Sequence, residues 1–280
     1  MISKAVIPVA GLGTRLRPLT GAVPKAMFPL VDAAGRVRPV LHRILAEASS
    51  AGVGAAALIV SAGQQEVIEG YLAAARAAGD RDLPGELVFV TQPNPDGFGD
   101  AVLRAAEFAG QDPFMLMLGD HVYVAQDDWP TCAAQVAGAF ERYGGKAMIG
   151  VQDVGADELS RVGVARGRPI EGRVYSCARL VEKPDLATVR QGLLTPGLPE
   201  GRFLAHCGLY VFSPAIFDCL RYLRSAGGRG GAELELTDAQ AELLDRHPQD
   251  YRLVRVAGTA YDTGTPAGYA RTFSRFGVAG

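Results

Sequence analysis

The sequence lacks the features that mark several classes of protein. Its four cysteines are scattered with no Cys-x-x-Cys pair, which argues against disulfides and zinc and favours free buried thiols in a reducing compartment. No apolar run approaches the roughly 18 residues of a membrane span. The first residues lead directly into an expected strand, so we expect no signal peptide. We therefore expect a cytoplasmic protein with no membrane partner.

The sequence also lacks a large excess of positive or negative charge. The 28 Lys and Arg residues almost balance the 30 Asp and Glu residues, for a formal net charge of −2. General binding to nucleic acid or to a membrane surface needs a basic excess, so we expect neither partner. No hexapeptide repeat is present, which excludes an appended left-handed β-helix. What remains is a chain of 280 residues, 48% hydrophobic, that can bury a substantial core.

The first half of the chain alternates apolar runs with segments of helical periodicity. This alternation predicts an α/β fold: a doubly wound, mainly parallel (mixed) sheet flanked by helices, with ligand sites at the carboxyl ends of the strands. Expected strands are 5–9, 55–61, 87–91, 114–118 and 147–151. Expected helices lie around 40–48, 67–75, 102–108 and 132–143.

The pattern changes after residue 152. Short segments alternate with turns and predict a small antiparallel sheet made of 163–166, 173–175 and 179–182. Later strands are expected at 206–212 and 251–256, with helices near 216–223, 238–247 and 265–276. No linker separates the halves, so we expect one domain, 1–280, composed of halves 1–152 and 153–280. The glycine cluster 227–231 is expected to be a surface loop.

The most informative stretch follows the first strand. Gly11 and Gly13 let the backbone approach a ligand closely, and Arg15 and Lys25 place two cations beside them. Free N–H groups backed by positive charge suit a triphosphate. The spacing fits neither a P-loop nor a dinucleotide fingerprint, since Leu16 stands where a third glycine is needed. An ordinary strand-to-helix turn is the alternative interpretation.

Two further motifs follow predicted strands. Gln92 offers an amide donor and acceptor that suit the edge of a pyrimidine base, and Gly97 permits close backbone approach. The alternative is a proline-rich turn with a solvated glutamine. Asp120 follows the most apolar strand and is a candidate Mg²⁺ ligand, or else a capping aspartate. We interpret His121 as structural because Mg²⁺ prefers oxygen ligands.

The second half contributes three candidates. The turn Arg161-Val-Gly163 carries little information by itself. Glu182 and Lys183 end a predicted strand, where the acid could bind sugar hydroxyls and the base a phosphate, although an exposed ion pair is the more common outcome. Asp262 stands between the last strand and the last helix and is a second candidate oxygen ligand, or else begins the turn or caps the helix.

Together these motifs resemble the signature of the sugar-1-phosphate nucleotidylyltransferases. Residues 11–25 carry Gly-x-Gly-Thr-Arg-Leu-x-Pro-x-Thr-x-x-x-Pro-Lys. The other motifs follow in the family's order along essentially the whole chain: Gln92 with Gly97, Gly119-Asp120, Arg161-x-Gly163, Glu182-Lys183-Pro184, Cys207-Gly208-Leu209-Tyr210, Glu233-Leu-Glu-Leu-Thr237-Asp238 and Asp262-x-Gly264. An ordered set of this length is far more specific than any single motif.

The resemblance implies a fold, a reaction and a set of site residues. The fold is a Rossmann-like nucleotidyltransferase fold with a small antiparallel sugar-binding sub-region, and the reaction is Mg²⁺-assisted attack of a sugar 1-phosphate on the α-phosphorus of a nucleoside triphosphate. The implied nucleotide-binding residues are Ala10, Gly11, Leu12, Gly13, Thr14, Arg15, Lys25, Gln92, Gly97 and Asp120. The implied sugar-phosphate-binding residues are Gly163, Glu182, Lys183 and Gly208. The implied catalytic residues are Arg15, Lys25, Asp120, Lys183 and Asp262, of which Asp120 and Asp262 are the metal ligands.

The resemblance also gives expectations about substrates. Ala10-Gly11-Leu12 is similar to the branch that uses UTP and glucose 1-phosphate, which are the expected substrates. The motif around Gln92 is similar to thymidylyltransferases, and Gly21 stands where uridylyltransferases usually carry lysine, so dTTP, ATP or CTP remain alternatives. A non-catalytic nucleotide-sugar sensor is a remote alternative, because the charged site residues are all present. A homo-oligomer, either a dimer or a tetramer, is expected.

Overall fold

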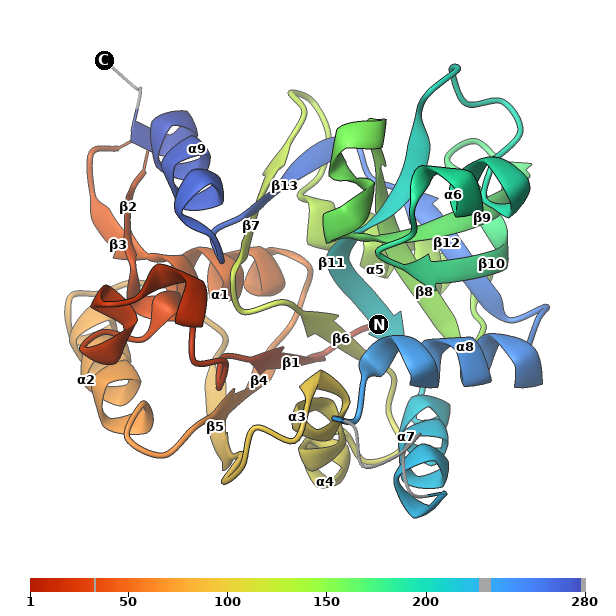
Figure 1. The fold of residues 1–280 in the computed structure, drawn as a ribbon. Helices are drawn as coiled ribbons and strands as arrows, with labels where there is room; N and C mark the ends of the chain where they lie inside the picture. The colour runs from red at the N-terminus through yellow and green to blue at the C-terminus, as the bar shows by residue number, and fades with distance from the viewer. Residues whose placement is uncertain (33, 227–232, 278–280) are drawn as a thin grey trace.

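The computed structural model describes residues 1–32, 34–226 and 233–277 (Figure 1). The expected surface loop at 227–231 lies outside these residues. Within the described part of the chain, no helix is long and apolar enough to cross a membrane.

The strands are, in chain order, β1 (Lys4–Pro8), β2 (Pro29–Val31), β3 (Val37–Pro39), β4 (Ala55–Val60), β5 (Glu86–Thr91), β6 (Phe114–Met117), β7 (His121–Ala125), β8 (Ala147–Val154), β9 (Gly163–Glu171), β10 (Val174–Glu182), β11 (Phe203–Phe212), β12 (Tyr251–Arg255) and β13 (Gly258–Asp262). The α-helices are α1 (Val40–Ser50), α2 (Gln65–Ala77), α3 (Phe98–Arg104), α4 (Ala106–Ala109), α5 (Cys132–Tyr143), α6 (Leu186–Gly192), α7 (Ala215–Ser225), α8 (Leu236–Arg246) and α9 (Pro266–Gly277). Short 3₁₀ helices are η1 (Thr14–Leu16), η2 (Leu19–Gly21), η3 (Lys25–Met27) and η4 (Ala156–Arg161).

A nine-stranded sheet forms the centre of the molecule, in the order β5-β4-β1-β6-β11-β8-β12-β10-β9. The neighbours β5, β4, β1 and β6 are parallel, and β12 is parallel to β8. In contrast, β11 runs antiparallel to both β6 and β8. This mixed sheet flanked by helices confirms the predicted fold class.

Helices cover both faces of the sheet, which explains why its central strands are apolar on both faces. β6 and β11 are buried along their whole length. Apolar side chains of α1, α2 and α5 pack against one face, and those of α3, α7 and α8 pack against the other (Figure 1). In α1, for example, Ile44, Leu45 and Ala48 are fully buried at the three-to-four-residue spacing of a core-facing stripe. The loops at the strand ends are therefore left free to build a site.

Most elements lie where the periodicity predicts them, but two expectations are wrong in detail. The helix expected at 102–108 is two short helices, α3 and α4, which meet at Ala105. The antiparallel segments do not form a separate small sheet. β9 and β10 pair with each other, but β10 also pairs with β12 and β9 with β11, so both extend the main sheet. The pairing of β9 with β10 contains bulges, which interrupt the alternation of inward and outward side chains. The sequence pattern therefore divided β10 into two short strands.

The sequence did not predict the two-stranded ribbon formed by β7 and β13. The two strands lie side by side in Figure 1 and are antiparallel. His121 is the register partner of Asp262. Each strand has five residues and mixes polar with apolar side chains. The ribbon lies outside the main sheet and joins the end of β6 to the start of α9.

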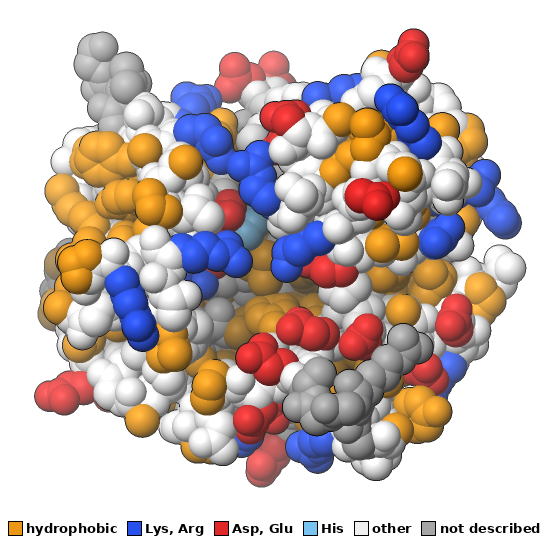
Figure 2. Space-filling model, viewed as in Figure 1, with side chains coloured by type: hydrophobic (Ala, Val, Ile, Leu, Met, Phe, Trp, Pro, Cys, Tyr) orange, Lys and Arg blue, Asp and Glu red, His pale blue; other side chains and the backbone are white. Residues whose placement is uncertain are grey.

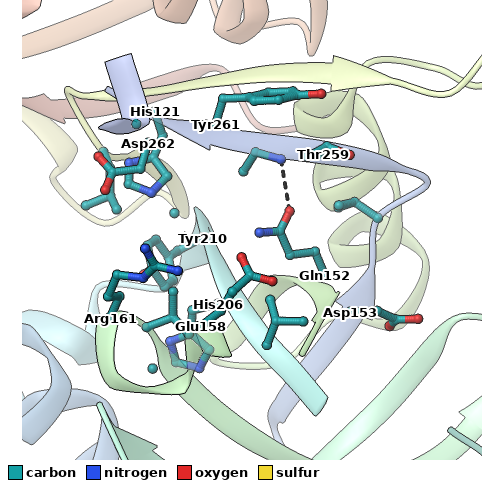
Figure 3. A pocket seen from close by; sticks show the side chains of 18 of the residues that line it. His121, Gln152, Asp153, Glu158, Arg161, His206, Tyr210, Thr259, Tyr261 and Asp262 are labelled. Atoms are coloured by element: carbon teal, nitrogen blue, oxygen red, sulfur yellow. Dashed lines mark hydrogen bonds between the residues drawn. The ribbon is translucent and has the colours of Figure 1, made fainter. Parts of the chain in front are cut away.

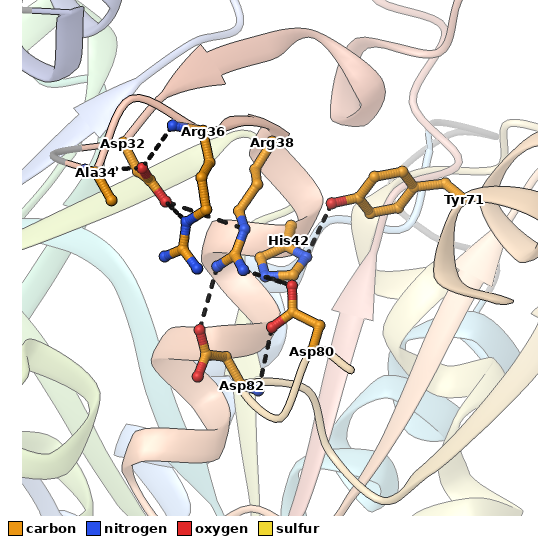
Figure 4. Close-up of polar contacts among 8 residues, drawn as sticks. All are labelled: Asp32, Ala34, Arg36, Arg38, His42, Tyr71, Asp80 and Asp82. Atoms are coloured by element: carbon orange, nitrogen blue, oxygen red, sulfur yellow. Dashed lines mark hydrogen bonds and ion pairs between the residues drawn. The ribbon is translucent and has the colours of Figure 1, made fainter. Parts of the chain in front are cut away.

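A polar network fastens the β2–β3 hairpin to α1 and to the loop after α2 (Figure 4). Arg38, with 10% of its side chain exposed, donates to Asp80 at 2.5 Å and to Asp82 at 3.1 Å. The buried His42 ring lies 2.9 Å from the Tyr71 hydroxyl and 3.5 Å from Asp80. The three groups His42, Asp80 and Asp82 are close enough to share a metal ion, but Arg38 already neutralises both carboxylates. We interpret this network as structural.

Candidate active site

The site residues predicted from the sequence meet in a cleft that consists of two adjoining cavities (Figure 2). The smaller cavity, about 480 Å³, is lined among others by Ala10, Gly11, Leu12, Arg15, Lys25, Gln92, Gly97, Asp120, Glu182, Lys183 and Asp262. The larger cavity, about 960 Å³, is lined among others by Gly163, Glu182, His206, Gly208, Tyr210 and Asp262. Of the predicted site residues, Gly13 and Thr14 line neither cavity.

The loop after β1 is irregular and is built from the short turns η1, η2 and η3. Gly13 adopts the left-handed region with φ of 59°, and a Cβ there would lie 2.8 Å from a methyl carbon of Thr20. The Thr20 hydroxyl donates to the Gly13 carbonyl at 2.8 Å, and Leu16 is buried. These contacts turn the chain back so that Lys25 lies over Gly11. A Cβ on Gly11 would be 3.4 Å from Lys25 Nζ. Gly13 thus shapes the loop, whereas Gly11 faces the cavity.

Lys25, Asp120, His121 and Asp262 form a charged cluster where the two cavities meet. Lys25 Nζ lies 2.5 Å from Asp120 Oδ2, and His121 Nδ1 lies 2.9 Å from Asp120 Oδ1. The β7–β13 ribbon brings Asp262 opposite His121. The backbone N–H and the hydroxyl of Thr263 both donate to the Asp120 carbonyl at 2.8 Å. The ladder and these bonds fix the distance between two carboxylates that are far apart in the sequence.

The cluster shifts the pKa of its own members. Burial alone would raise the pKa of Asp120, but attraction to Lys25 and a hydrogen bond from His121 outweigh it and lower that pKa below its usual value. Burial alone would lower the pKa of His121, yet its bond to Asp120 and the charges of Asp120 and Asp262 raise it. Asp120 is therefore held as a carboxylate.

The donor atoms in this cluster suit a divalent cation. Ligand atoms of Asp120, His121 and Asp262 all lie within 4.8 Å of one another. Two carboxylates supply the oxygen ligands that Mg²⁺ prefers. Both Asp120 oxygens already have partners, Lys25 and His121, so a cation at Asp120 competes with the Lys25 ammonium. The possible acidic ligands predicted from the sequence are present and close together.

Gln92 is held in one orientation by its neighbours. Its Nε2 donates to the Gly97 carbonyl at 3.1 Å and to Asp100 Oδ2 at 3.0 Å. Asp100 is itself fixed by Arg104, whose Nε donates to it at 2.8 Å. A carboxylate only accepts hydrogen bonds, so this contact assigns the amide nitrogen. Within the described residues Oε1 has no hydrogen bond, and Gln92 lines the smaller cavity, so this oxygen is available as an acceptor.

Gly97 and Gly119 are glycines because other backbone segments pass close to them. At Gly97, φ is 104° and a Cβ would lie 2.5 Å from the Leu234 carbonyl oxygen. At Gly119, a Cβ would collide with the Pro8 carbonyl at the end of β1. From the sequence we expected Gly97 to let the backbone approach a ligand closely. The structure adds that the segment entering α8 packs against this glycine.

Glu182 and Lys183 end β10 at the border between the cavities. Lys183 Nζ lies 3.2 Å from Glu182 Oε1, with 55% and 42% of the two side chains exposed. Lys183 has a left-handed φ of 45°, unusual for a residue with a side chain, and its N–H donates to the Val162 carbonyl at 3.1 Å. The two residues form an exposed ion pair, which is the more common outcome for such a motif, but they also line the cleft.

Gly163 and Gly208 both line the larger cavity. A Cβ on Gly163 would be 3.0 Å from Glu182 Oε2 and 3.1 Å from His206 Nδ1. Gly208 has φ of 77° at the irregular step in β11, and its carbonyl accepts from Leu118 N–H at 3.1 Å. At both positions a side chain would collide with neighbouring atoms of the cavity lining, so the lining there consists of bare backbone.

Sequence reasoning missed several residues that line the cleft. His121, interpreted as structural, contacts Asp120 directly. Arg161, whose turn carried little information, lines both cavities. His206 and Tyr210 project from β11 into the larger cavity (Figure 3). The adjacency of His121 to Asp120 was an available signal, whereas His206 stands in an apolar run with no local pattern.

Comparisons with known proteins agree with the geometry. Residues 4–276 match the family model described as "Nucleotidyl transferase". The chain is 33% identical over 287 residues to UTP–glucose-1-phosphate uridylyltransferase 2 of Staphylococcus saprophyticus, covering 97% of this chain and 90% of that protein. It is 31% identical over 295 residues to UTP–glucose-1-phosphate uridylyltransferase YngB of Bacillus subtilis, covering 99% of this chain and 90% of that protein.

Solved structures share the fold. A UDP-glucose pyrophosphorylase complexed with UDP-glucose matches with a TM-score of 0.81 at 27% identity, covering 99% of this chain and 98% of that one. A UTP-bound UGPase from Acinetobacter baumannii matches with a TM-score of 0.77 at 26% identity, covering 100% of this chain and 95% of that one. These matches confirm the family that the motifs indicated. The chain belongs to the nucleotidyl transferase family and is a nucleotidyltransferase.

Proposed function

We propose that this chain transfers the uridylyl group of UTP to glucose 1-phosphate, forming UDP-glucose and releasing pyrophosphate. The observation that carries the proposal is the cluster of Lys25, Asp120 and Asp262 at the junction of two cavities. Both substrates are anions, so the site must cancel their repulsion and align them, and alignment is worth about 7–11 kcal/mol. The names of the S. saprophyticus and B. subtilis relatives support this choice of substrates.

Each charged residue has a role in the proposed reaction. A phosphate oxygen of glucose 1-phosphate attacks the α-phosphorus of UTP in line, and the bond to the pyrophosphate oxygen breaks. Arg15 neutralises the departing pyrophosphate, Lys25 contacts the α-phosphate, and Lys183 holds the phosphate of the sugar. Asp120 and Asp262 would hold Mg²⁺, which supplies positive charge at the reacting phosphorus. No side chain has to act as a nucleophile.

The fixed amide of Gln92 supports a pyrimidine base with an N–H at position 3. Its Oε1 can accept from uracil N3–H, whereas the N3 of cytosine is an acceptor and would face it unfavourably. Asp100 holds the amide in this orientation. Uracil and thymine share the N3–H group, so this contact selects UTP and dTTP over CTP.

A pyrophosphate-release assay tests the function. The purified protein is given glucose 1-phosphate with UTP, dTTP, CTP or ATP, each with and without Mg²⁺. We expect the highest kcat/KM with UTP, a low rate with CTP, and no turnover without the metal. Preference for dTTP would replace the uridylyl assignment, and the absence of pyrophosphate release with every triphosphate would overturn the enzymatic function.

We also propose that the chain forms a homo-oligomer, a dimer or a tetramer. Large apolar side chains are exposed on β3 and α9, with Val37 68% and Phe273 41% accessible. α9 packs against β2, so α9 and the β2–β3 hairpin lie on one side of the molecule (Figure 1). Light scattering on the purified protein measures the number of subunits, and a monomer at all concentrations would contradict the proposal.

A further inference from the structure

His206 is a polar side chain that the proposed mechanism leaves without a role. It lies in the otherwise apolar strand β11, is 9% exposed, and lines the larger cavity (Figure 3). In the described part of the chain neither ring nitrogen has a hydrogen-bond partner, and Nε2 is buried. A buried polar atom without a partner costs stability that an apolar side chain of similar size would not. An imidazole at this position therefore calls for an explanation other than packing.

The ring borders the surface where the sugar is proposed to lie. The position of a Cβ on Gly163 would be 3.1 Å from His206 Nδ1 and 3.0 Å from Glu182 Oε2. His206 and Glu182 thus flank the same glycine. A hydroxyl group that packs on the bare backbone of Gly163 would meet a carboxylate on one side and the imidazole on the other.

Two neighbours fix the orientation and the charge of the ring. Tyr210 packs edge-to-face on it, with centroids 5.9 Å apart and planes at 85°. Burial lowers the pKa of His206 to about 4, so the ring is neutral near pH 7 and carries one donor and one acceptor nitrogen. A neutral imidazole suits a sugar hydroxyl, whereas the phosphate of the sugar is proposed to bind the cation of Lys183.

We propose that His206 is a specificity-determining residue for the sugar, and that its Nδ1 hydrogen-bonds the sugar hydroxyl that packs against Gly163. The inference rests on the proposed function, because it assumes that the larger cavity receives the hexose of glucose 1-phosphate. Tyr210 acts through His206 and is a positioning residue.

Deoxy analogues of the substrate test the contact. The kcat/KM values of the wild type and of His206→Phe are measured with glucose 1-phosphate and with its 2-, 3-, 4- and 6-deoxy forms. In the wild type we expect a loss of about 10-fold for the analogue that lacks the contacted hydroxyl. In His206→Phe the enzyme should no longer distinguish that one analogue from glucose 1-phosphate, while the KM for UTP stays unchanged.

A second histidine provides a matched control. His247 follows the last residue of α8 and lines neither cavity, so His247→Phe should keep the wild-type response to all four analogues. His206→Asn retains a side-chain donor and acceptor and should restore part of the discrimination. If His206→Phe discriminates against every analogue as the wild type does, the proposal is wrong.

A binding measurement on the wild-type protein does not depend on whether the His206 variants fold. The chain has four histidines, and the imidazole ¹⁵N signals of His206 can be assigned by elimination with variants of the other three. Saturating UDP-glucose should shift the Nδ1 signal, and saturating UDP should not. Binding of UDP-glucose without this shift overturns the role of His206 alone. A failure of UDP-glucose to bind overturns the proposed function itself.

Discussion

Lys25 and Asp120 form an ion pair across the candidate active site, with 2.5 Å between Nζ and Oδ2 and less than a fifth of each side chain exposed. One partner comes from the loop after β1 and the other from the end of β6. Lys25 is paired with the candidate metal-binding carboxylate, and Asp120 is paired with the candidate phosphate-binding cation and with His121. The pair therefore links the position of the phosphate-binding cation to that of the metal-binding carboxylate.

Removal of either partner should abolish most of the activity. We expect Lys25→Ala and Asp120→Asn each to lower kcat by about 10²–10³, because one preorganised electrostatic contact is lost. The steady-state rate of pyrophosphate release measures the effect, and circular dichroism checks the fold. Lys4→Ala is the control, since Lys4 pairs with Asp112 on the surface at 2.9 Å. Near-normal turnover in either site variant would refute the assigned roles.

The orientation of Gln92 should decide between UTP and CTP. In Asp100→Asn the neighbour can donate as well as accept, so only the Gly97 carbonyl still favours the present orientation of the Gln92 amide. We expect the ratio of kcat/KM for UTP to that for CTP to fall about 10-fold, the value of roughly one hydrogen bond. Asp112→Asn, which alters an exposed aspartate, should leave the ratio unchanged. An unaltered ratio in Asp100→Asn would contradict the proposed contact to the base.

Two glycine substitutions should have opposite effects on stability. Gly208→Ala places a Cβ 2.8 Å from Leu118 Cδ1 at φ of 77°, and should destabilise the chain by about 1–3 kcal/mol. Gly138→Ala in α5 meets no atom within 4 Å and should stabilise it by about 0.5–1 kcal/mol. Urea unfolding measures both. Equal urea midpoints of unfolding for the two variants would show that a side chain at Gly208 does not strain β11.

Arg38 should be essential to the polar network beside α1. Arg38→Met leaves Asp80 and Asp32 with little exposure and a missing partner, and we expect a loss of about 3–5 kcal/mol. Arg142→Met removes a pair with Glu171 in which both side chains are mostly exposed, and should cost at most about 1 kcal/mol. Chemical denaturation compares them, and similar losses would mean that burial of the Arg38 pairs has no consequence.

Glu47 should make stability depend on pH. Burial raises its pKa from 4.5 to about 7, although it accepts a hydrogen bond from Ala133 N–H at the start of α5. The folded chain therefore keeps this proton over a range where the unfolded chain has lost it. Its contribution is full below about pH 4.5 and declines as pH rises to about 7, by about 3 kcal/mol.

The matched variant for this effect is Glu47→Gln, which retains an acceptor for Ala133 but does not titrate. The difference in unfolding free energy between wild type and variant, measured from pH 4 to pH 8, isolates the carboxyl group. The wild type should lose stability relative to the variant as pH rises. A difference that is constant with pH would exclude the shifted pKa.

The sequence predicted the parts of the site that follow apolar strands. Asp120 follows the fully buried strand β6, and Gln92 follows the apolar but only half-buried strand β5. Lys25 begins the short 3₁₀ helix η3 in the loop after β1. Parallel strands deliver such residues to one edge of a sheet. This reasoning needs only local periodicity and the order of elements.

Other parts depend on contacts that have no local pattern. The pairing of β7 with β13 joins segments that are remote in the chain and only five residues long. The extension of the main sheet by β9 and β10 depends on bulges and on partners elsewhere. His206 occupies a position whose neighbours indicate core packing. Tertiary contact, rather than propensity, decides all three.

Because of the β7–β13 ribbon, different parts of the chain position the two carboxylates and line the larger cavity. It ties Asp120 and Asp262 together by backbone pairing, independently of the residues between β7 and β13. Much of the wall of the larger cavity belongs to that intervening segment. The part of the chain that recognises the acceptor can therefore diverge through insertion or substitution while the spacing of the two carboxylates stays the same, which offers a route to new sugar acceptors on an unchanged catalytic frame.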